Sequence, residues 1–186
     1  MNKLMKWEKM KNKKGFTLVE VIVVMAVIGI MVTIAIPGIS SWLPNYKLKS
    51  AARDVYSSLQ KARMLAVKNN RNAAVIFDAA NNKYDVCDDW VSTASPPCVG
   101  SLVTTDFNSL GYGIGYGHGN ATSAVGTGFD NNITYPGDDV VFTPSGLGNA
   151  SGYVYLENRN NVATYAIGSL TSGSIRISKW NGSAWE

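Results

Sequence analysis

The most distinctive hydrophobic pattern of the chain is a long apolar run near its amino terminus. Between residues 21 and 36 only Thr33 is polar, and the whole segment 16–37 has 22 residues. A helix of that length is about 33 Å long, close to the ~30 Å hydrocarbon core of a bilayer. The pattern therefore predicts a transmembrane helix over residues 16–37.

A second pattern follows Pro37-Gly38, a pair that is expected to interrupt the helix by a kink or by local melting, because proline removes a backbone hydrogen bond. Pro44 is a candidate second break. Beyond it, apolar residues recur at spacings of three and four, which predicts an amphipathic helix within residues 38–71 that ends near Asn69-Asn70. The apolar seam comprises Leu48, Ala52, Val55, Leu59, Ala62 and Ala66. We expect this seam to pack against a sheet of the same chain.

From residue 72 onward the hydrophobic period changes to two, which predicts short β-strands separated by turns. Strands are expected at residues 73–77, 83–86, 140–142, 153–156, 163–167 and 174–178. Short strands joined by turns favour a mainly antiparallel sheet, one face of which the long helix would cover. The predicted class is α+β, with a globular β-rich head over residues 72–186.

The segment 100–137 fits no element. Five glycines alternate between residues 111 and 119, without the Gly-x-Gly-x-x-Gly spacing of a dinucleotide-binding loop. A flexible insertion and a glycine-rich surface hairpin both account for this pattern. Tyr112 and Tyr116 are candidate partner contacts at its tip.

The formal net charge of +4 is unevenly distributed. Residues 1–15 carry a net charge of +5, residues 45–71 carry +6, and residues 72–186 carry −6. Lysines before the apolar run and none within it predict a cytoplasmic amino terminus. The basic faces of the second helix are solvated, or they contact neighbouring subunits or anionic lipid headgroups.

Glu20 is the one charged residue of the apolar segment. A carboxylate there costs on the order of 2–3 kcal/mol, and the segment offers it no obvious partner. Neither a secretory signal peptide nor a plain membrane anchor explains Glu20, and the run exceeds the roughly 7–15 apolar residues of a signal peptide. Cleavage between Gly15 and Phe16 would free an amino group that is largely protonated at neutral pH. Glu20 of one subunit would then neutralise the amino terminus of the next.

The motif Lys14-Gly15-Phe16-Thr17-Leu18-Val19-Glu20, followed by an apolar helix, resembles the class III signal of type IV pilins and type II secretion pseudopilins. The resemblance implies a pilin-like fold and a prepilin peptidase that removes residues 1–15 by cutting after Gly15. It also implies N-methylation of Phe16 by the same enzyme, and a role for Glu20 in assembly.

The same resemblance implies a single-pass protein of the bacterial inner membrane, with a cytoplasmic amino terminus and a periplasmic head. Its expected partners are the prepilin peptidase, the lipid of the inner membrane, an assembly platform, and other pilin or pseudopilin subunits that pack through the amino-terminal helix.

Three stretches of the head resemble the domain shared by the minor pseudopilin H of type II secretion and the FimT and FimU minor pilins. These stretches are Val75-Ile76-Phe77, Phe142-Thr143-Pro144-Ser145-Gly146 and Gly173-Ser174-Ile175-Arg176. The resemblance implies a structural subunit of a pilus-like secretion filament. The alternative is a minor type IV pilin that primes pilus assembly or captures DNA. The FimT-like motif Gly-Arg-x-Arg lacks its first arginine here, which leaves Arg176 as the candidate DNA contact and argues against nucleic acid as a partner.

A head outside the cytoplasm would expose Cys87 and Cys98 to an oxidising compartment, so we expect a disulfide between them. A single histidine and the absence of Cys-x-x-Cys argue against a metal or other cofactor. No sequence motif marks a nucleophile, so no catalytic residue is predicted. The acids Asp85, Asp88 and Asp89 are interpreted as solvated surface residues.

Overall fold

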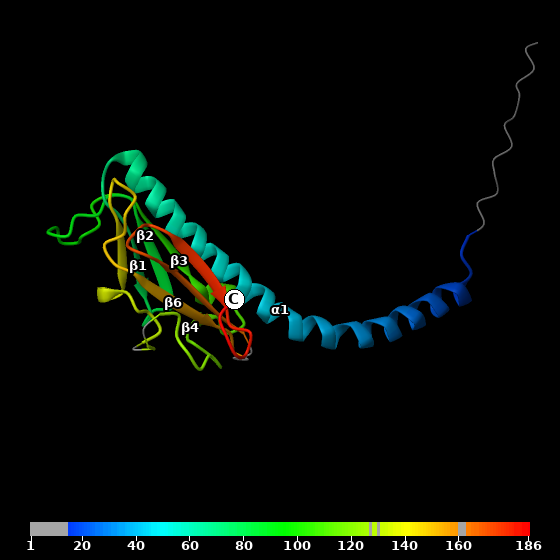
Figure 1. Ribbon diagram of the computed structural model, residues 1–186. Coiled ribbons are helices and arrows are strands. Elements are labelled where there is room, and N and C mark those ends of the chain that lie inside the picture. The colour runs from blue at the N-terminus through cyan, green and yellow to red at the C-terminus, as the bar shows by residue number, and fades with distance from the viewer. Residues whose placement is uncertain (1–14, 127, 130, 160–162) are drawn as a thin grey trace, which may run out of the picture. The chain divides into compact units, whose positions relative to one another are not determined.

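The computed structural model describes residues 15–126, 128–129, 131–159 and 163–186, with the backbone alone at 34–41. These residues form one long helix, two short 3-10 helices and eight strands (Figure 1). The chain divides into two compact units, Met1–Ser40 and Ser41–Glu186.

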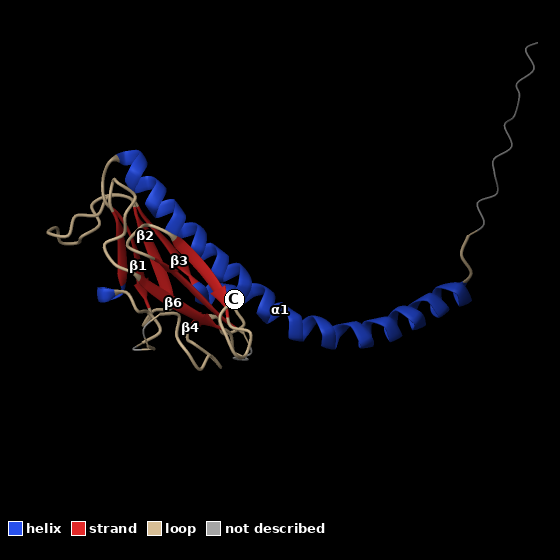
Figure 2. Cartoon of the chain, viewed as in Figure 1, coloured by secondary structure: helices blue, strands red, loops and turns tan. Residues whose placement is uncertain are grey.

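Helix α1 runs from Leu18 to Asn69 and has 52 residues (Figure 2). It continues through Pro37-Gly38 and through Pro44, so the prediction that the helix melts locally at these prolines is wrong. A proline removes one N–H donor, and the hydrogen bonds of the flanking turns are sufficient to keep the backbone helical.

The carboxy-terminal end of α1 lies where the sequence predicts it. Asn70 adopts a left-handed conformation with a φ of 52°, and the N–H of Arg71 donates to the carbonyl oxygen of Ala66 at 3.2 Å. This bond joins the second residue after the helix to the fourth from its end, as in a Schellman cap. Asparagine tolerates the left-handed region better than most residues, which explains why the helix stops at this point.

The carboxy-terminal unit contains two four-stranded sheets, and every strand pair within them is antiparallel. The first sheet has the order β3-β2-β1-β5, with β3 Leu102–Asp106, β2 Lys83–Cys87, β1 Ala73–Asp78 and β5 Asp139–Phe142. The second has the order β4-β6-β7-β8, with β4 Gly115–Tyr116, β6 Gly152–Glu157, β7 Thr164–Ser169 and β8 Ile175–Lys179. The 3-10 helices are η1 Phe107–Leu110 and η2 Pro136–Asp138.

The apolar seam of α1 forms the centre of the core, as the periodicity predicts. All six seam residues, from Leu48 to Ala66, are fully buried. They belong to one cluster with strand residues from both sheets, among them Val75, Phe142, Leu156 and Ile167. Figure 1 shows the carboxy-terminal half of α1 lying along the sheets. Burial of each large aliphatic side chain contributes roughly 1.5–3 kcal/mol, so this contact fixes the helix on the head.

Six predicted strands are present as β1, β2, β5, β6, β7 and β8. The segment 100–137 also contains β3 and β4, which the sequence pattern did not reveal. Strand β3 has an almost wholly exposed burial pattern, and β4 has two residues, so neither shows a hydrophobic alternation.

The glycine-rich segment packs tightly against strand β6. A Cβ atom on Gly117 would lie 2.1 Å from the carboxyl carbon of Glu157, and the N–H of Gly119 donates to that carboxylate at 2.7 Å. Gly115 pairs with Glu157 in the β4–β6 ladder. The segment is therefore a packed part of the head, and the interpretation as a flexible insertion is wrong for it.

Tyr116 does not lie at a tip. Its ring packs edge-on against Phe107, and its hydroxyl donates to the carbonyl oxygen of Lys83 at 2.7 Å. Burial raises the pKa of this hydroxyl well above its usual range. The predicted partner contact at Tyr116 is thus replaced by an internal one, whereas Tyr112 is 43% exposed.

Candidate processing and assembly site

The bond between Gly15 and Phe16 lies in non-helical backbone directly before α1. Phe16 is 84% exposed, and a Cβ atom on Gly15 would meet nothing within 4 Å. Exposed backbone outside regular secondary structure is the kind of segment that peptidases cleave most readily. The preceding residues 1–14, which hold the lysines of the predicted leader, lie outside the described residues.

Thr17 and Glu20 form a reciprocal cap at the start of α1. The hydroxyl oxygen of Thr17 accepts a hydrogen bond from the N–H of Glu20 at 3.2 Å, and the Glu20 carboxylate accepts one from the N–H of Thr17 at 3.5 Å. This is a capping box, in which two backbone donors at the helix start are satisfied by side chains. The negative charge also lies at the positive end of the helix dipole.

The capping box corrects one premise of the sequence interpretation, which gave Glu20 no partner within its own segment. The carboxylate has a local structural role that does not require a second subunit. It retains acceptor capacity, because an ionised carboxylate offers about four lone-pair sites and this cap uses one. The spacing Thr-x-x-Glu before an apolar run is a known sequence signature of this cap.

The first four turns of α1 present apolar side chains on every face. The large apolar residues here are 43–78% exposed: Leu18, Val19, Val21, Ile22, Val23, Val24, Met25, Val27, Ile28, Ile30, Met31 and Val32. An exposed apolar surface of this size marks a contact with lipid or with other proteins. Among the residues whose side chains the structure describes, which exclude 34–41, no helical segment is both long and apolar enough to cross a membrane.

A disulfide joins Cys87 and Cys98, with their Cα atoms 5.9 Å apart. It closes the loop between β2 and β3, which further contacts reinforce. The guanidinium of Arg71, just past the end of α1, forms an ion pair with Asp89, and the N–H of Trp90 donates to the carbonyl oxygen of Asn72 at 2.8 Å. The loop is therefore tied both to itself and to the end of the helix.

The acids near the disulfide make internal bonds instead of being simply solvated. Asp88 accepts a hydrogen bond from the N–H of Ser101 at 2.6 Å, and Asp85 lies 3.7 Å from the ammonium of Lys83. Among the described residues, no group of three or more His, Cys, Asp or Glu side chains is arranged to hold a metal ion.

Arg176 is exposed on β8, an edge strand of the second sheet, and pairs with Gly168 of β7. The disulfide lies at the first sheet, so the structure does not bring these candidate residues together. Gly15, Phe16 and Glu20 are grouped at the start of α1. The sequence interpretation missed Thr17, which the capping-box spacing would have revealed.

The comparisons with known proteins divide along the same two parts of the chain. Residues 10–36 match the prokaryotic N-terminal methylation motif, and residues 51–178 match the family described as type II transport protein GspH. Two fimbrial proteins of Pseudomonas aeruginosa are each 32% identical over 77 residues, which are 41% of this chain and 49% of each relative. The chain therefore spans about half the length of these curated relatives.

Among solved structures, the crystal structure of the type IV minor pilin FimU from Pseudomonas aeruginosa superposes with a TM-score of 0.54. The alignment covers 78% of this chain and 96% of FimU at 14% identity, so it supports the fold alone. It confirms the predicted pilin-like α+β architecture. Because the family match extends over most of the chain and follows a methylation motif, this protein belongs to the GspH family of type II transport proteins, a group of pilin-like proteins.

Proposed function

We propose that this chain is a minor pseudopilin, a structural subunit of a periplasmic pilus-like filament in type II protein secretion. The observation that carries the proposal is the exposed apolar start of α1, which follows directly on the exposed Gly15–Phe16 bond. An apolar helix of this kind needs lipid or other helices around it, and a filament subunit meets both in turn.

In this proposal a prepilin peptidase removes residues 1–15 and methylates the new amino terminus at Phe16. The apolar segment then holds the subunit in the bacterial inner membrane, with the head in the periplasm. The Cys87–Cys98 disulfide is consistent with that oxidising compartment. An assembly platform would draw the subunit out of the lipid, and packing between helices must offset the loss of lipid contact.

The Glu20 carboxylate has one partner in the single subunit and gains a second in the filament in this proposal. In the single subunit its carboxylate caps α1 through the N–H of Thr17. In the filament the remaining acceptor sites would receive the ammonium at Phe16 of a neighbouring subunit. A charge-assisted contact in a low-dielectric environment is stronger than one in water, so this pairing would favour assembly in the correct register.

The main alternative is a minor type IV pilin that primes pilus assembly. The fimbrial relatives and the FimU fold favour it, whereas the GspH family match favours secretion. DNA capture is a weaker candidate, because residues 72–186 carry a net charge of −6 and Arg176 lacks a neighbouring arginine in its motif. We propose no catalytic role for the chain.

The proposal is tested in a strain that lacks the gene. This strain is complemented either with the wild-type chain or with the Glu20→Ala chain. Loss of a secreted protein from the culture medium, with surface pili intact, is the result expected for a pseudopilin. Loss of surface pili with secretion intact would support the minor pilin instead. Neither phenotype, or full rescue by the Glu20→Ala chain, would contradict a role in filament assembly.

A further inference from the structure

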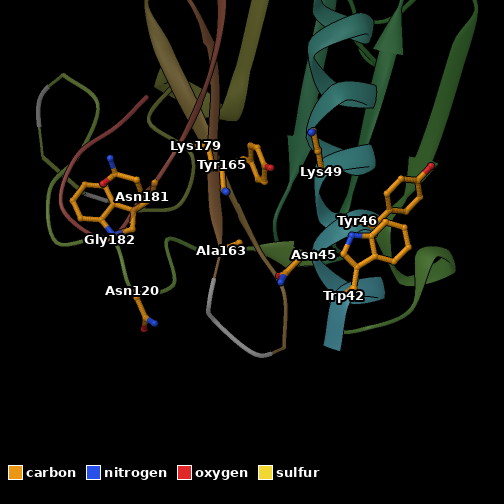
Figure 3. A pocket seen from close by; sticks show the side chains of 11 residues that line it. Trp42, Asn45, Tyr46, Lys49, Asn120, Ala163, Tyr165, Lys179, Asn181 and Gly182 are labelled. Carbon is orange, nitrogen blue, oxygen red and sulfur yellow. The ribbon is translucent and has the colours of Figure 1, made fainter. Parts of the chain in front are cut away.

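The head contains a cavity of about 760 Å³ whose chemistry the proposed function does not use. It lies between the first turns of α1 within the head, the start of β7 and the segment after β8 (Figure 3). Trp42, Asn45, Tyr46 and Lys49 line it from one face of α1, at spacings of three and four residues. Lys179 and Trp180 line it from the other side.

The charged side chains that line this cavity are both basic. Two ammonium groups, those of Lys49 and Lys179, line it, and both side chains belong to exposed residues. Among the described residues that line the cavity, none carries a carboxylate. The carboxylate of Glu186 accepts a hydrogen bond from the amide of Asn181, a residue that lines the cavity. A site with this balance is suited to a ligand that is anionic and rich in acceptors.

The aromatic wall of the cavity indicates where that ligand comes from. Trp42 and Tyr46 stack with their ring centroids 4.9 Å apart, yet they are 59% and 53% exposed. Exposed Trp and Tyr beside lysines are typical of the membrane interface, where an apolar ring and a polar tip are both accommodated. Trp42 follows the apolar run by six residues, which is less than two helical turns.

We infer that this cavity binds the phosphate-bearing headgroup of an anionic phospholipid while the subunit is stored in the membrane. Lys49 and Lys179 neutralise the phosphate, and Trp42 and Tyr46 lie against the glycerol and the upper acyl chain. The inference rests on the proposed function, because the headgroup is within reach only when residues 16–37 lie in the bilayer. Release of this lipid would then be part of the cost of extraction into a filament.

The test is native mass spectrometry of the full chain in a non-ionic detergent, titrated with phosphatidylglycerol, phosphatidylcholine or free glycerol phosphate. The wild-type chain is expected to retain one phosphatidylglycerol in preference to phosphatidylcholine. The double substitution Lys49→Ala/Lys179→Ala should weaken this retention about 25-fold, since each basic residue contributes roughly a factor of five at an anionic lipid surface.

The matched control is Lys61→Ala/Lys68→Ala, which removes the same charge from a different groove on α1. It should leave lipid retention unchanged. Equal weakening by both double variants, equal retention of the two lipids, or equally tight binding of free glycerol phosphate would each overturn the inference. The filament is not needed for this assay, so a correctly processed chain that shows no lipid preference contradicts the lipid site alone. An unprocessed chain that never enters the membrane contradicts the proposed function.

Discussion

The carboxylate of Glu20 and the hydroxyl of Thr17 each accept a hydrogen bond from the other residue's backbone N–H. The same carboxylate is the group proposed to pair with the amino terminus of a neighbouring subunit. A loss of assembly on replacing Glu20 with alanine would therefore have two causes, a frayed helix start and a missing charge. The two causes can be separated, because glutamine also serves in a capping box.

Glu20→Gln should keep the helix start, be processed normally at Gly15, and fail to enter filaments, because the charge is lost while the cap is kept. Thr17→Ala should assemble nearly as well as the wild type, although loss of the cap costs roughly 1 kcal/mol of helix stability. The measurement is the amount of each chain in sheared filament fractions, relative to the membrane fraction. Normal incorporation of Glu20→Gln would show that pairing through charge is wrong.

Removal of the Cys87–Cys98 disulfide should destabilise the head by about 2–3 kcal/mol, the chain-entropy value for a loop of this size. Thermal unfolding followed by circular dichroism, with and without dithiothreitol, measures the effect. The Cys87→Ala/Cys98→Ala chain serves as the control and should be insensitive to the reductant. An unchanged melting temperature of the reduced wild-type chain would mean that Arg71–Asp89 and the backbone bonds hold the loop without the disulfide.

Gly173 is the position in the head where a larger residue should be least tolerated. It has a φ of +77°, and a Cβ atom there would lie 2.0 Å from the carbonyl oxygen of Gly146, which also accepts the guanidinium N–H of Arg63 at 2.9 Å. Gly173→Ala should cost on the order of 2–4 kcal/mol, from backbone strain and overpacking together.

Gly111→Ala is the matched control for Gly173→Ala. Gly111 has a φ of +71°, and a Cβ atom there would meet no atom within 4 Å. Its substitution by alanine therefore introduces backbone strain without overpacking. It should cost about 1–3 kcal/mol, because its φ of 71° with a ψ of −166° is a conformation that favours glycine. Chemical denaturation of the two variants measures the difference, and equal losses would show that the contact with Gly146 has no energetic weight.

Asp139 should reduce the stability of the head at neutral pH. Partial burial, and then the neighbouring Asp138, raise the pKa of its carboxyl above the ordinary value of 3.8. A raised pKa in the folded state means that the folded chain binds the proton more tightly, so stability falls as the pH rises through that pKa. Asp139→Asn should therefore raise the melting temperature at pH 7 and have little effect well below pH 3.8.

Asp78→Asn is the control with the opposite sign. Hydrogen bonds from the side chain and then the backbone of Asn81 lower the pKa of Asp78. Its contribution to stability is present above the ordinary value and is lost as the pH falls through the lowered pKa. Asp78→Asn should lower the melting temperature at pH 7 and converge with the wild type in acid. A difference that does not change with pH in either variant would contradict the electrostatic explanation.

The local patterns of the sequence predict most of this fold. The seam from Leu48 to Ala66 and the strands with alternating side chains depend on spacing along the chain, which a sequence displays. The fold of the glycine-rich segment depends on contacts distant in sequence, above all that between Gly117 and Glu157, and no local pattern reveals them. For the same reason the cavity between Lys49 and Lys179 is visible only in the structure, whereas the cap between Thr17 and Glu20 could be predicted from four residues.

The central claim is that residues 1–15 are removed and that Phe16, once methylated, begins the assembled subunit. An intact-mass measurement of the chain purified from membranes of its native host tests this claim most directly. The account predicts a single species that starts at Phe16 and carries one added methyl group on its amino terminus. An unprocessed chain, or a chain that has lost the apolar segment up to residue 37, would contradict it.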